Sequence, residues 1–375
     1  MAEQSGGNDL TPGCAEPARV TPPTRAVTLG SMTDGGRVTE AAPLPASAPP
    51  PSAGANGAAP PADLARLTDL ARRIVRNVEL VVRGRTEAVE LVTVALLAGG
   101  HIVVEDVPGT GKTTLARALA RSLGGSFQRV QATADLLPAD ITGSSIWEPG
   151  GQRFLFVPGP VFANVVLVDE LNRTPPRTQS AFLEVMEEGA VTVDGVRHRV
   201  PDPFLVVATQ NPLEQHGTYP LPEGQLDRFA VRLRLGGLDA ASELAVVREQ
   251  LGGSTVDRLG AVTDAEELLA ARHAVRRVYA AEAVMQHALA IVRATREDPR
   301  IRLGASSRAA ITLVRCAQAW AVLRGRDYVT PDDVRALVVP VLAHRLGLVA
   351  ATAGGTSAEL VVAELTARVP VPVRP

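Results

Sequence analysis

The segment from His101 to Thr114 reads HIVVEDVPGTGKTT and contains the most specific sequence signal of the chain. Its first five residues form an apolar run that is too short for a helix and fits a buried strand. A glycine loop follows, and the segment from Lys112 to Leu123 has a helical pattern. A strand, a glycine-rich turn and a helix in this order are the structural context of a phosphate-binding loop. The stretch therefore predicts a site for a nucleoside triphosphate.

Lys112 stands out because it is the single lysine among 38 basic residues. A compact ammonium group can lie between two phosphates where a planar guanidinium is too wide. Lys112 is expected to bridge the β- and γ-phosphates, while backbone N–H groups of the loop cradle the β-phosphate. The Thr113 hydroxyl would ligate Mg²⁺. Asp106 replaces the first glycine of the usual pattern, at a position that shapes the turn rather than touching phosphate.

Two further apolar runs end in polar side chains that suit hydrolysis of ATP. The run 165–168 leads into Asp169 and Glu170, and the run 204–208 leads to Asn211. Such continuous runs are typical of strands buried on both faces of a parallel sheet. Asp169 is expected to hold the Mg²⁺ shell, and Glu170 is expected to polarise the attacking water. The amide of Asn211 could orient that water and sense the γ-phosphate.

Two arginines complete the predicted set of catalytic residues. Arg228 comes just before the next expected strand, at 230–235, and could reach the γ-phosphate of a neighbouring subunit. Arg308 opens a C-terminal helix, with Ser306 as its cap, and could reach the nucleotide of its own subunit. In so arginine-rich a chain, either could instead be an ordinary surface residue.

The chain divides into three parts by composition and pattern. Residues 1–61 are rich in Ala, Pro and Gly and predict a disordered tail. Residues 62–237 alternate helical and strand patterns and predict an α/β nucleotide-binding domain, with a parallel sheet sandwiched by helices. Residues 238–375 predict an all-helical lid domain. Within the α/β part, the segment 191–200 alternates around Asp194-Gly195 and predicts a β-hairpin.

Composition limits the classes of function that the chain can have. A net charge of −2 gives no argument for binding to nucleic acid or to an anionic membrane. Cys14 and Cys316 lie too far apart in the sequence to indicate a disulfide framework or a metal-ligand spacing. No uncharged apolar run reaches the length of a membrane span, and the first thirty residues lack the apolar core of a signal peptide. A cytoplasmic protein without membrane insertion is expected.

The motifs resemble those of the MoxR family of AAA+ ATPases, from about Arg83 to Pro372. The matching segments are LLAGGH, EDVPGTGKT, QATADLLPADITG, DELNRTPPRTQS, ATQNP and GASSRA, at 96–101, 105–113, 131–143, 169–180, 208–212 and 304–309. Family members usually have proline at the position of Ser307. They usually have Gln-Glu at the positions of Arg85 and Thr86, a difference that bears on the nucleotide-base pocket.

The resemblance implies an AAA+ core that binds ATP and Mg²⁺ between the subunits of a ring, usually a hexamer. That geometry gives Arg228 its role in trans. The nucleotide-binding residues that it implies are Pro108, Gly109, Thr110, Gly111, Lys112, Thr113, Thr114 and Val82.

Family members look like chaperones that remodel partner proteins, often ones with a von Willebrand factor A domain. The resemblance places the segment 136–162 and the hairpin at the ring pore or the client protein. Within this segment, the turn-rich stretch 146–151 exposes Trp147, which could contact a client or could cover the edge of its own domain.

Three other functions stay open at this point. One is the motor subunit of a metal-insertion complex that resembles magnesium chelatase. Another is an ATPase that acts on nucleic acid, such as a helicase loader, although no basic stripe or added DNA-binding module is visible. The third is a nucleotide-bound scaffold without turnover, which the presence of both Lys112 and Glu170 disfavours.

Overall fold

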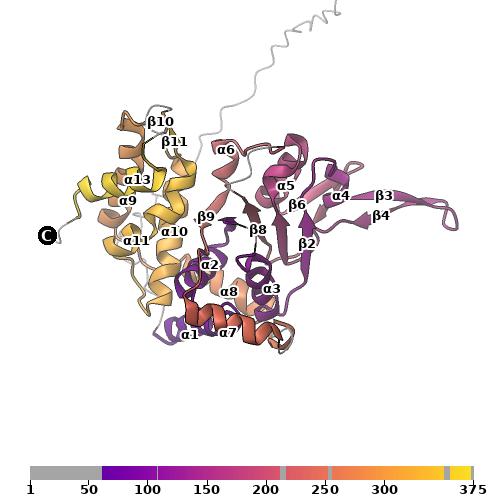
Figure 1. Ribbon diagram of the computed structural model, residues 1–375, viewed down its shortest axis with the longest axis horizontal. Coiled ribbons are helices and arrows are strands. Elements are labelled where there is room, and N and C mark those ends of the chain that lie inside the picture. Colours follow the sequence, from indigo (N-terminus) through magenta and orange to yellow (C-terminus); the bar gives the residue numbers. More distant parts are fainter. Residues whose placement is uncertain (1–60, 108, 212–216, 252–255, 350–354, 373–375) are drawn as a thin grey trace, which may run out of the picture. The chain divides into compact units, whose positions relative to one another are not determined.

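The structure is a computed structural model that describes residues 61–107, 109–211, 217–251, 256–349 and 355–372 (Figure 1). Residues 1–60, which carry the predicted tail, lie outside the described residues, and so does Pro108 of the glycine loop.

A five-stranded parallel sheet forms the centre of the α/β part. Its strand order is β2-β5-β8-β1-β9. The strands are β1 (His101–Glu105), β2 (Phe127–Gln131), β5 (Val165–Asp169), β8 (Leu205–Gln210) and β9 (Phe229–Leu233), and each neighbouring pair is parallel. The three apolar runs predicted as strands are therefore confirmed. β2 was not predicted, because its sequence FQRVQ is polar and its side chains are mostly exposed at the sheet edge.

Helices cover both faces of this sheet. One hydrophobic cluster joins Val104, Leu167 and Val207 to α1 (Pro61–Glu79), α2 (Thr86–Ala98) and α3 (Lys112–Ser122). The residues that alternate with these along the strands, such as Val103, Val168 and Val206, pack on the other face. There they meet α5 (Pro176–Glu188), with α4 (Pro138–Thr142) alongside it. Successive strand residues point to opposite faces, so a sheet of continuous apolar strands needs cover on both sides.

The C-terminal part is helical, as predicted, with one short addition. Its helices are α7 (Ala240–Leu251), α8 (Ala265–Val275), α9 (Glu282–Glu297), α10 (Ser307–Leu323), α11 (Pro331–Leu342) and α13 (Ala358–Arg368). Two 3₁₀ turns, η2 (Val256–Arg258) and η3 (Ala343–Arg345), lie between them. The addition is an antiparallel pairing of β10 (Ile301–Leu303) with β11 (Gly347–Leu348). None of the described helices combines the length and the apolar composition that crossing a bilayer requires.

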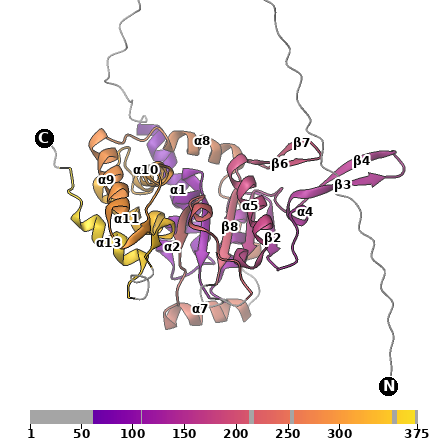
Figure 2. The ribbon, with the colours of Figure 1, turned by 90° about the horizontal axis from the view of Figure 1, so that it is seen from above.

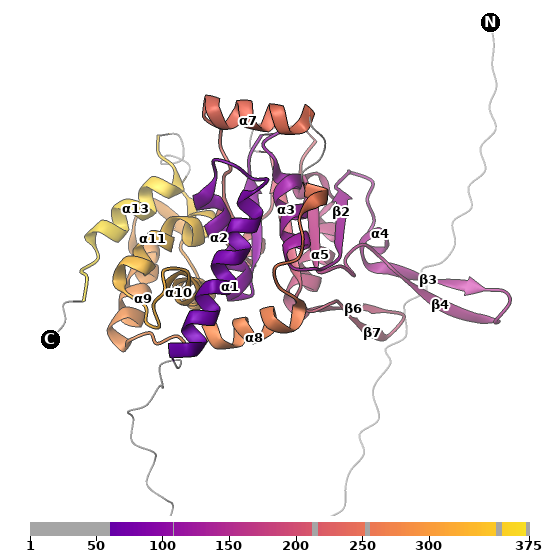
Figure 3. The same cartoon turned by 90° about the horizontal axis from the view of Figure 1, so that it is seen from below.

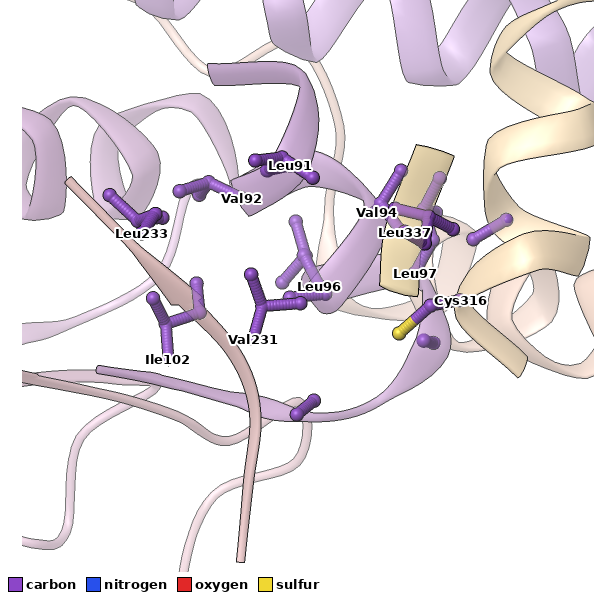
Figure 4. Packing of buried hydrophobic residues seen from close by; sticks show 14 of the residues in the cluster. Leu91, Val92, Val94, Leu96, Leu97, Ile102, Val231, Leu233, Cys316 and Leu337 are labelled. Carbon is purple, nitrogen blue, oxygen red and sulfur yellow. The ribbon is translucent and has the colours of Figure 1, made fainter. Parts of the chain in front are cut away.

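Helix α2 is apolar almost all round and joins the sheet to the C-terminal helices. Ten of its thirteen residues are buried. Figure 4 shows Leu96 and Leu97 of α2 near Val231 of β9, Cys316 of α10 and Leu337 of α11. Helix α8 packs against α1 and α2 (Figure 3). One continuous hydrophobic core therefore extends from the sheet into the C-terminal helices.

Two hairpins extend from the side of the sheet that carries α4 and α5 (Figure 2). The hairpin predicted around Asp194-Gly195 is confirmed as β6 (Ala190–Val193) and β7 (Val196–Arg199). Both turn residues have positive φ, 50° and 78°, as a two-residue hairpin turn requires.

The second hairpin, β3 (Gly143–Glu148) with β4 (Arg153–Pro158), replaces the excursion of turns expected there. Ile146 pairs with Leu155, and Trp147 pairs with Phe154. Both faces of this hairpin therefore carry exposed apolar side chains. The alternation that reveals a half-buried strand is absent from the sequence for that reason.

Candidate active site

The glycine loop connects β1 to α3 at the carboxyl edge of the sheet. Gly109 and Gly111 have φ values of 85° and 89°, in the left-handed region that favours glycine. Gly111 is also the N-cap of α3, so the free N–H groups of the first helical turn face the loop. This is the arrangement in which a helix N-terminus binds phosphate.

Lys112 lies in a cavity with residues from three other segments of the chain. Thr113, Asp169 and Glu170 line the same cavity, together with Gly109, Gly111, Arg129, Gln131 and Thr209. The Lys112 ammonium group donates hydrogen bonds to the carbonyl oxygens of Asp106 and Val107, at 2.8 and 2.9 Å. Six of the predicted site residues are thus brought together, four from the glycine loop and the beginning of α3 and two from the carboxyl end of β5.

Asp106 fixes the loop through contacts that the sequence did not predict. Its carboxylate accepts hydrogen bonds from the N–H groups of Val107, Leu235 and Gly236, at 2.8, 2.9 and 2.8 Å. The residue is buried. The expectation that this position shapes the turn is consistent with these bonds, which also tie the loop to the segment after β9.

Asp169 and Glu170 each have an arginine partner. Arg129 Nε lies 2.6 Å from Asp169 Oδ2, and Arg173 Nε lies 2.9 Å from Glu170 Oε2. Glu170 has a φ of 61°, and its N–H donates to the Thr209 hydroxyl at 2.9 Å. A non-glycine residue at positive φ is uncommon, and here a bond to the neighbouring strand holds it there.

The oxygen donors of this cavity fit Mg²⁺. The Thr113 hydroxyl and the Asp169 carboxylate line it together, and hard oxygen ligands suit this ion. No group of three or more His, Cys, Asp or Glu side chains among the described residues could hold a metal by itself. Mg²⁺ at nucleotide sites usually takes one or two protein ligands and completes its shell with phosphate and water.

A second cavity adjoins the same glycine loop and suits a nucleotide base. Val82 lines it, as the family resemblance implies, with Thr110, Thr114 and the apolar side chains of Val81, Leu238, Val246 and Val256. Arg85 also lines this cavity and donates to the carbonyl oxygens of Thr110 and Gly236. Burial lowers the pKa of its guanidinium. The unusual residue at this position therefore connects the phosphate loop to the segment after β9.

Asn211 lies at the entrance to the loop. It is buried and directly follows β8, which pairs with β1. The Asp106 N–H donates to the Gln210 carbonyl at 3.1 Å, so Asn211 emerges beside the beginning of the glycine loop.

Arg228 and Arg308 lie together at the amino edge of the sheet, where the strands begin, opposite the carboxyl edge that carries the glycine loop. Both bind Glu187 of α5: Arg228 Nε is 3.0 Å from Oε2, and Arg308 Nη2 donates to Oε1 at 2.7 Å. The hydrogen bond from Arg308 and the charges of both arginines lower the pKa of the Glu187 carboxyl. Phe229, next to Arg228, pairs with His101, the first residue of β1. The length of β1, roughly 15 Å, therefore separates this edge from the glycine loop.

The position of Arg308 bears on one expectation. Arg308 was expected to reach the nucleotide of its own subunit, but in this structure it contacts Glu187 beside Arg228. The packing of α10 against α2 directs the beginning of α10 toward the amino ends of the strands. Ser306 does cap α10, since its hydroxyl accepts the Ala309 N–H at 3.2 Å.

Comparison with known proteins agrees with this site. Residues 101–231 match the ATPase family associated with various cellular activities (AAA), and residues 293–365 match the AAA lid domain. The uncharacterized protein YeaC of Bacillus subtilis is 45% identical over 82% of this chain and 97% of its own. The chaperone MoxR1 of Mycobacterium tuberculosis is 38% identical over 74% and 75%. The crystal structure of a candidate ATPase from Cytophaga hutchinsonii has a TM-score of 0.77 and 35% identity, and covers 83% of this chain and 98% of its own.

The chain belongs to the MoxR family of AAA+ ATPases.

Several residues of this MoxR-family site were missed in the sequence. Arg129, Arg173 and Thr209 contact the two acidic residues, and Glu187 holds the two arginines. Arg173 lies in the DELNRTPP segment, three residues after Glu170, so a helical turn there would have indicated the contact. Arg129 and Glu187 gave no such signal, because their partners are distant in the sequence.

Proposed function

We propose that this MoxR-family protein hydrolyses ATP with Mg²⁺ in sites shared between neighbouring subunits of a ring, and that it remodels partner proteins. The observation that carries the proposal is the division of the predicted catalytic residues between two edges of one sheet. Lys112, Thr113, Asp169 and Glu170 line a cavity at the carboxyl edge. Arg228 and Arg308 are at the amino edge.

The residues at the carboxyl edge have the chemistry to bind and hydrolyse the nucleotide. Lys112 would exchange its two carbonyl partners for phosphate oxygens, which are stronger acceptors because they are charged. Thr113 and Asp169 would hold Mg²⁺, which neutralises phosphate charge when it is bound. Glu170 would accept a proton from the attacking water, which requires its carboxylate to leave Arg173. Asn211 would orient that water.

The two arginines would complete the site of the neighbouring subunit. They cannot serve the nucleotide of their own subunit from an edge that lies a strand's length away. Two guanidinium groups share one Glu187 carboxylate, so an excess positive charge is left for an incoming anion. The γ-phosphate of a neighbour's ATP is such an anion, and an arginine supplied from a neighbour typically accelerates phosphoryl transfer by large factors.

The two hairpins are the surface proposed to contact client proteins. Trp147 and Phe154 are 52% and 71% exposed and pack edge to face with their centroids 5.2 Å apart. Exposed aromatic side chains of this kind are common in protein interfaces. The proposal also includes a hexameric ring, a cytoplasmic location and a partner protein with a von Willebrand factor A domain. These three features are inferred from the family resemblance.

Replacement of the proposed water-activating residue tests this function. Glu170→Gln keeps the size of the side chain but removes the proton acceptor, so the variant should bind ATP, remain assembled and release no phosphate. Phosphate release and the mass of the ATP-bound assembly would be measured on the same sample. Undiminished release of phosphate would rule out the role assigned to Glu170.

A further inference from the structure

Arg345, from the 3₁₀ turn η3, is buried beneath the segment that carries Arg228. It is 3% exposed, and its Nε lies 3.0 Å from Asp227 Oδ1. Its Nη2 donates to the carbonyl oxygens of Asp227 and Phe229, at 3.2 and 2.7 Å, and its Nη1 donates to the Val341 carbonyl at 2.7 Å. One planar guanidinium therefore binds the residues on both sides of Arg228.

Two other side chains of the C-terminal part hold the same segment. His344 is buried, and its Nε2 lies 3.0 Å from the Phe229 carbonyl oxygen. A carbonyl only accepts, so Nε2 must be the protonated nitrogen of this ring. The Ser306 hydroxyl donates to Asp227 Oδ2 at 3.0 Å, two residues before Arg308. The backbone around Arg228 is thus bound by side chains from η3 and from the beginning of α10.

Stability alone does not account for an arginine at this position. Burial of a charged pair costs desolvation free energy that the attraction between the charges often does not recover, and apolar residues can stabilise such a site equally well. The planar fork of an arginine does supply several bonds in fixed directions. Here those bonds end on the carbonyl oxygens of Asp227 and Phe229, on either side of Arg228, and the guanidinium also forms an ion pair with the Asp227 carboxylate.

We propose that Arg345 is a positioning residue, which fixes the backbone of residues 227–229 so that Arg228 can reach the γ-phosphate of the neighbouring subunit. The inference rests on the shared site proposed above. Because Arg345 belongs to the C-terminal part, the placement of η3 against the sheet then controls how Arg228 is presented. Arg345 itself touches neither nucleotide nor metal in this arrangement.

The test is Arg345→Lys, which keeps the positive charge but cannot reproduce the planar set of bonds. The variant should lower kcat for ATP about 10-fold while KM stays within about twofold, because binding at its own glycine loop is unchanged. Arg326→Lys is the matched control. Arg326 binds the buried carboxylate of Asp333 in the same helical part, but it does not contact residues 227–229. The Arg326→Lys variant should leave kcat and KM unchanged after correction for the folded fraction.

Two further measurements separate positioning from a merely structural role. Arg345→Lys should add no further loss of kcat in the Arg228→Ala background, since both changes remove the same contribution. Mixture with Lys112→Ala, whose Arg228 is intact, should restore turnover to Arg345→Lys as it does to Arg228→Ala. If Arg345→Lys does not fold, Asp227→Asn removes the charge partner of Arg345, and Ser306→Ala removes a second side-chain contact with the same segment; both should lower kcat with the same pattern.

Four results would overturn the proposal. A raised KM with unchanged kcat would mean that Arg345 supports its own nucleotide site. An additive loss of kcat in the Arg228→Ala background would mean that it acts independently of Arg228. Rescue of Arg228→Ala but not of Arg345→Lys by Lys112→Ala would refute the positioning role alone, whereas rescue of neither variant would refute the shared site together with it.

Discussion

At the scale of single residues, Lys112 is the residue most important for the proposed nucleotide binding. It is the single lysine of the chain, so an amine-reactive reagent can modify one side chain only. Bound ATP should protect Lys112 from modification, because its ammonium group would lie between phosphates rather than against the carbonyl groups of the loop. Peptide mapping after labelling measures the protection, with the N-terminal amine as the internal control. Equal labelling of Lys112 with and without ATP would contradict its proposed role.

The sequence was informative about residues whose chemistry depends on local context. Lys112 and Thr113 begin a helix, Asp169 ends a strand and Glu170 follows it, and the structure brings all four into one cavity. The sequence was uninformative about contacts between residues that lie far apart in the chain. The contacts of Asp106 with Leu235 and Gly236, and of Arg85 with Gly236, span more than 120 residues and arise from the pairing of β1 with β9.

At the scale of secondary-structure elements, the first residue of β1 makes stability dependent on pH. His101 is buried, and burial lowers its pKa to about 4. Its Nδ1 accepts the Val206 N–H at 3.0 Å and its Nε2 lies 3.0 Å from the Met186 carbonyl oxygen, so the folded state requires the neutral ring. The unfolded state binds a proton more readily, so this contribution to stability is fully present above pH 6.5 and is lost as pH falls to 4.

The free energy of unfolding should therefore fall by about 3 kcal/mol through this one group between pH 6.5 and pH 4. His101→Gln has a donor and an acceptor but does not titrate, so its unfolding should depend less on pH. Urea denaturation of both proteins across this range gives the difference. Parallel pH profiles would show that His101 is not the titrating group.

The β3–β4 hairpin carries a prediction about client proteins. Trp147→Ser with Phe154→Ser removes its paired aromatic side chains, which lie on the surface and away from both cavities. ATP hydrolysis without a client should be unchanged, whereas stimulation of hydrolysis by a client should fall at least about 10-fold, as expected for interface aromatic residues. The same pair of changes at Tyr279 and Tyr328, which are also exposed aromatic residues but lie outside both hairpins, is the control. Full stimulation of the Trp147/Phe154 variant would exclude the hairpin as a contact surface.

Elements were predictable where one physical pattern dominated. Continuous apolar runs predicted β1, β5 and β8, and the Asp194-Gly195 turn predicted the β6–β7 hairpin. The hydrophobic pattern did not predict β2, because that strand is mostly polar. It also did not predict β3 and β4, because they carry exposed apolar side chains on both faces. Such strands are stabilised by backbone pairing with a neighbour, which a single sequence does not reveal.

At the scale of the whole molecule, the described part of the chain is an AAA+ core joined to helices through one shared hydrophobic cluster. The helical C-terminal part was predictable from its pattern, but the direction in which it presents Arg308 was not. That direction depends on how α10 packs on α2, and the sequence alone suggested a role toward the subunit's own nucleotide. With Arg308 beside Arg228, the proposed function assigns both arginines to the site of a second subunit.

The ATPase activity of a mixture of two inactive variants tests whether neighbouring subunits share each site. Lys112→Ala lacks the phosphate grip and keeps its arginines, while Arg228→Ala keeps the glycine loop. If each site takes its loop from one subunit and its arginine from the next, random mixing should make about one quarter of the interfaces complete. We expect each variant alone to be nearly inactive and the equimolar mixture to recover about a quarter of the wild-type rate. A mixture that is no more active than the average of its components would contradict the shared site.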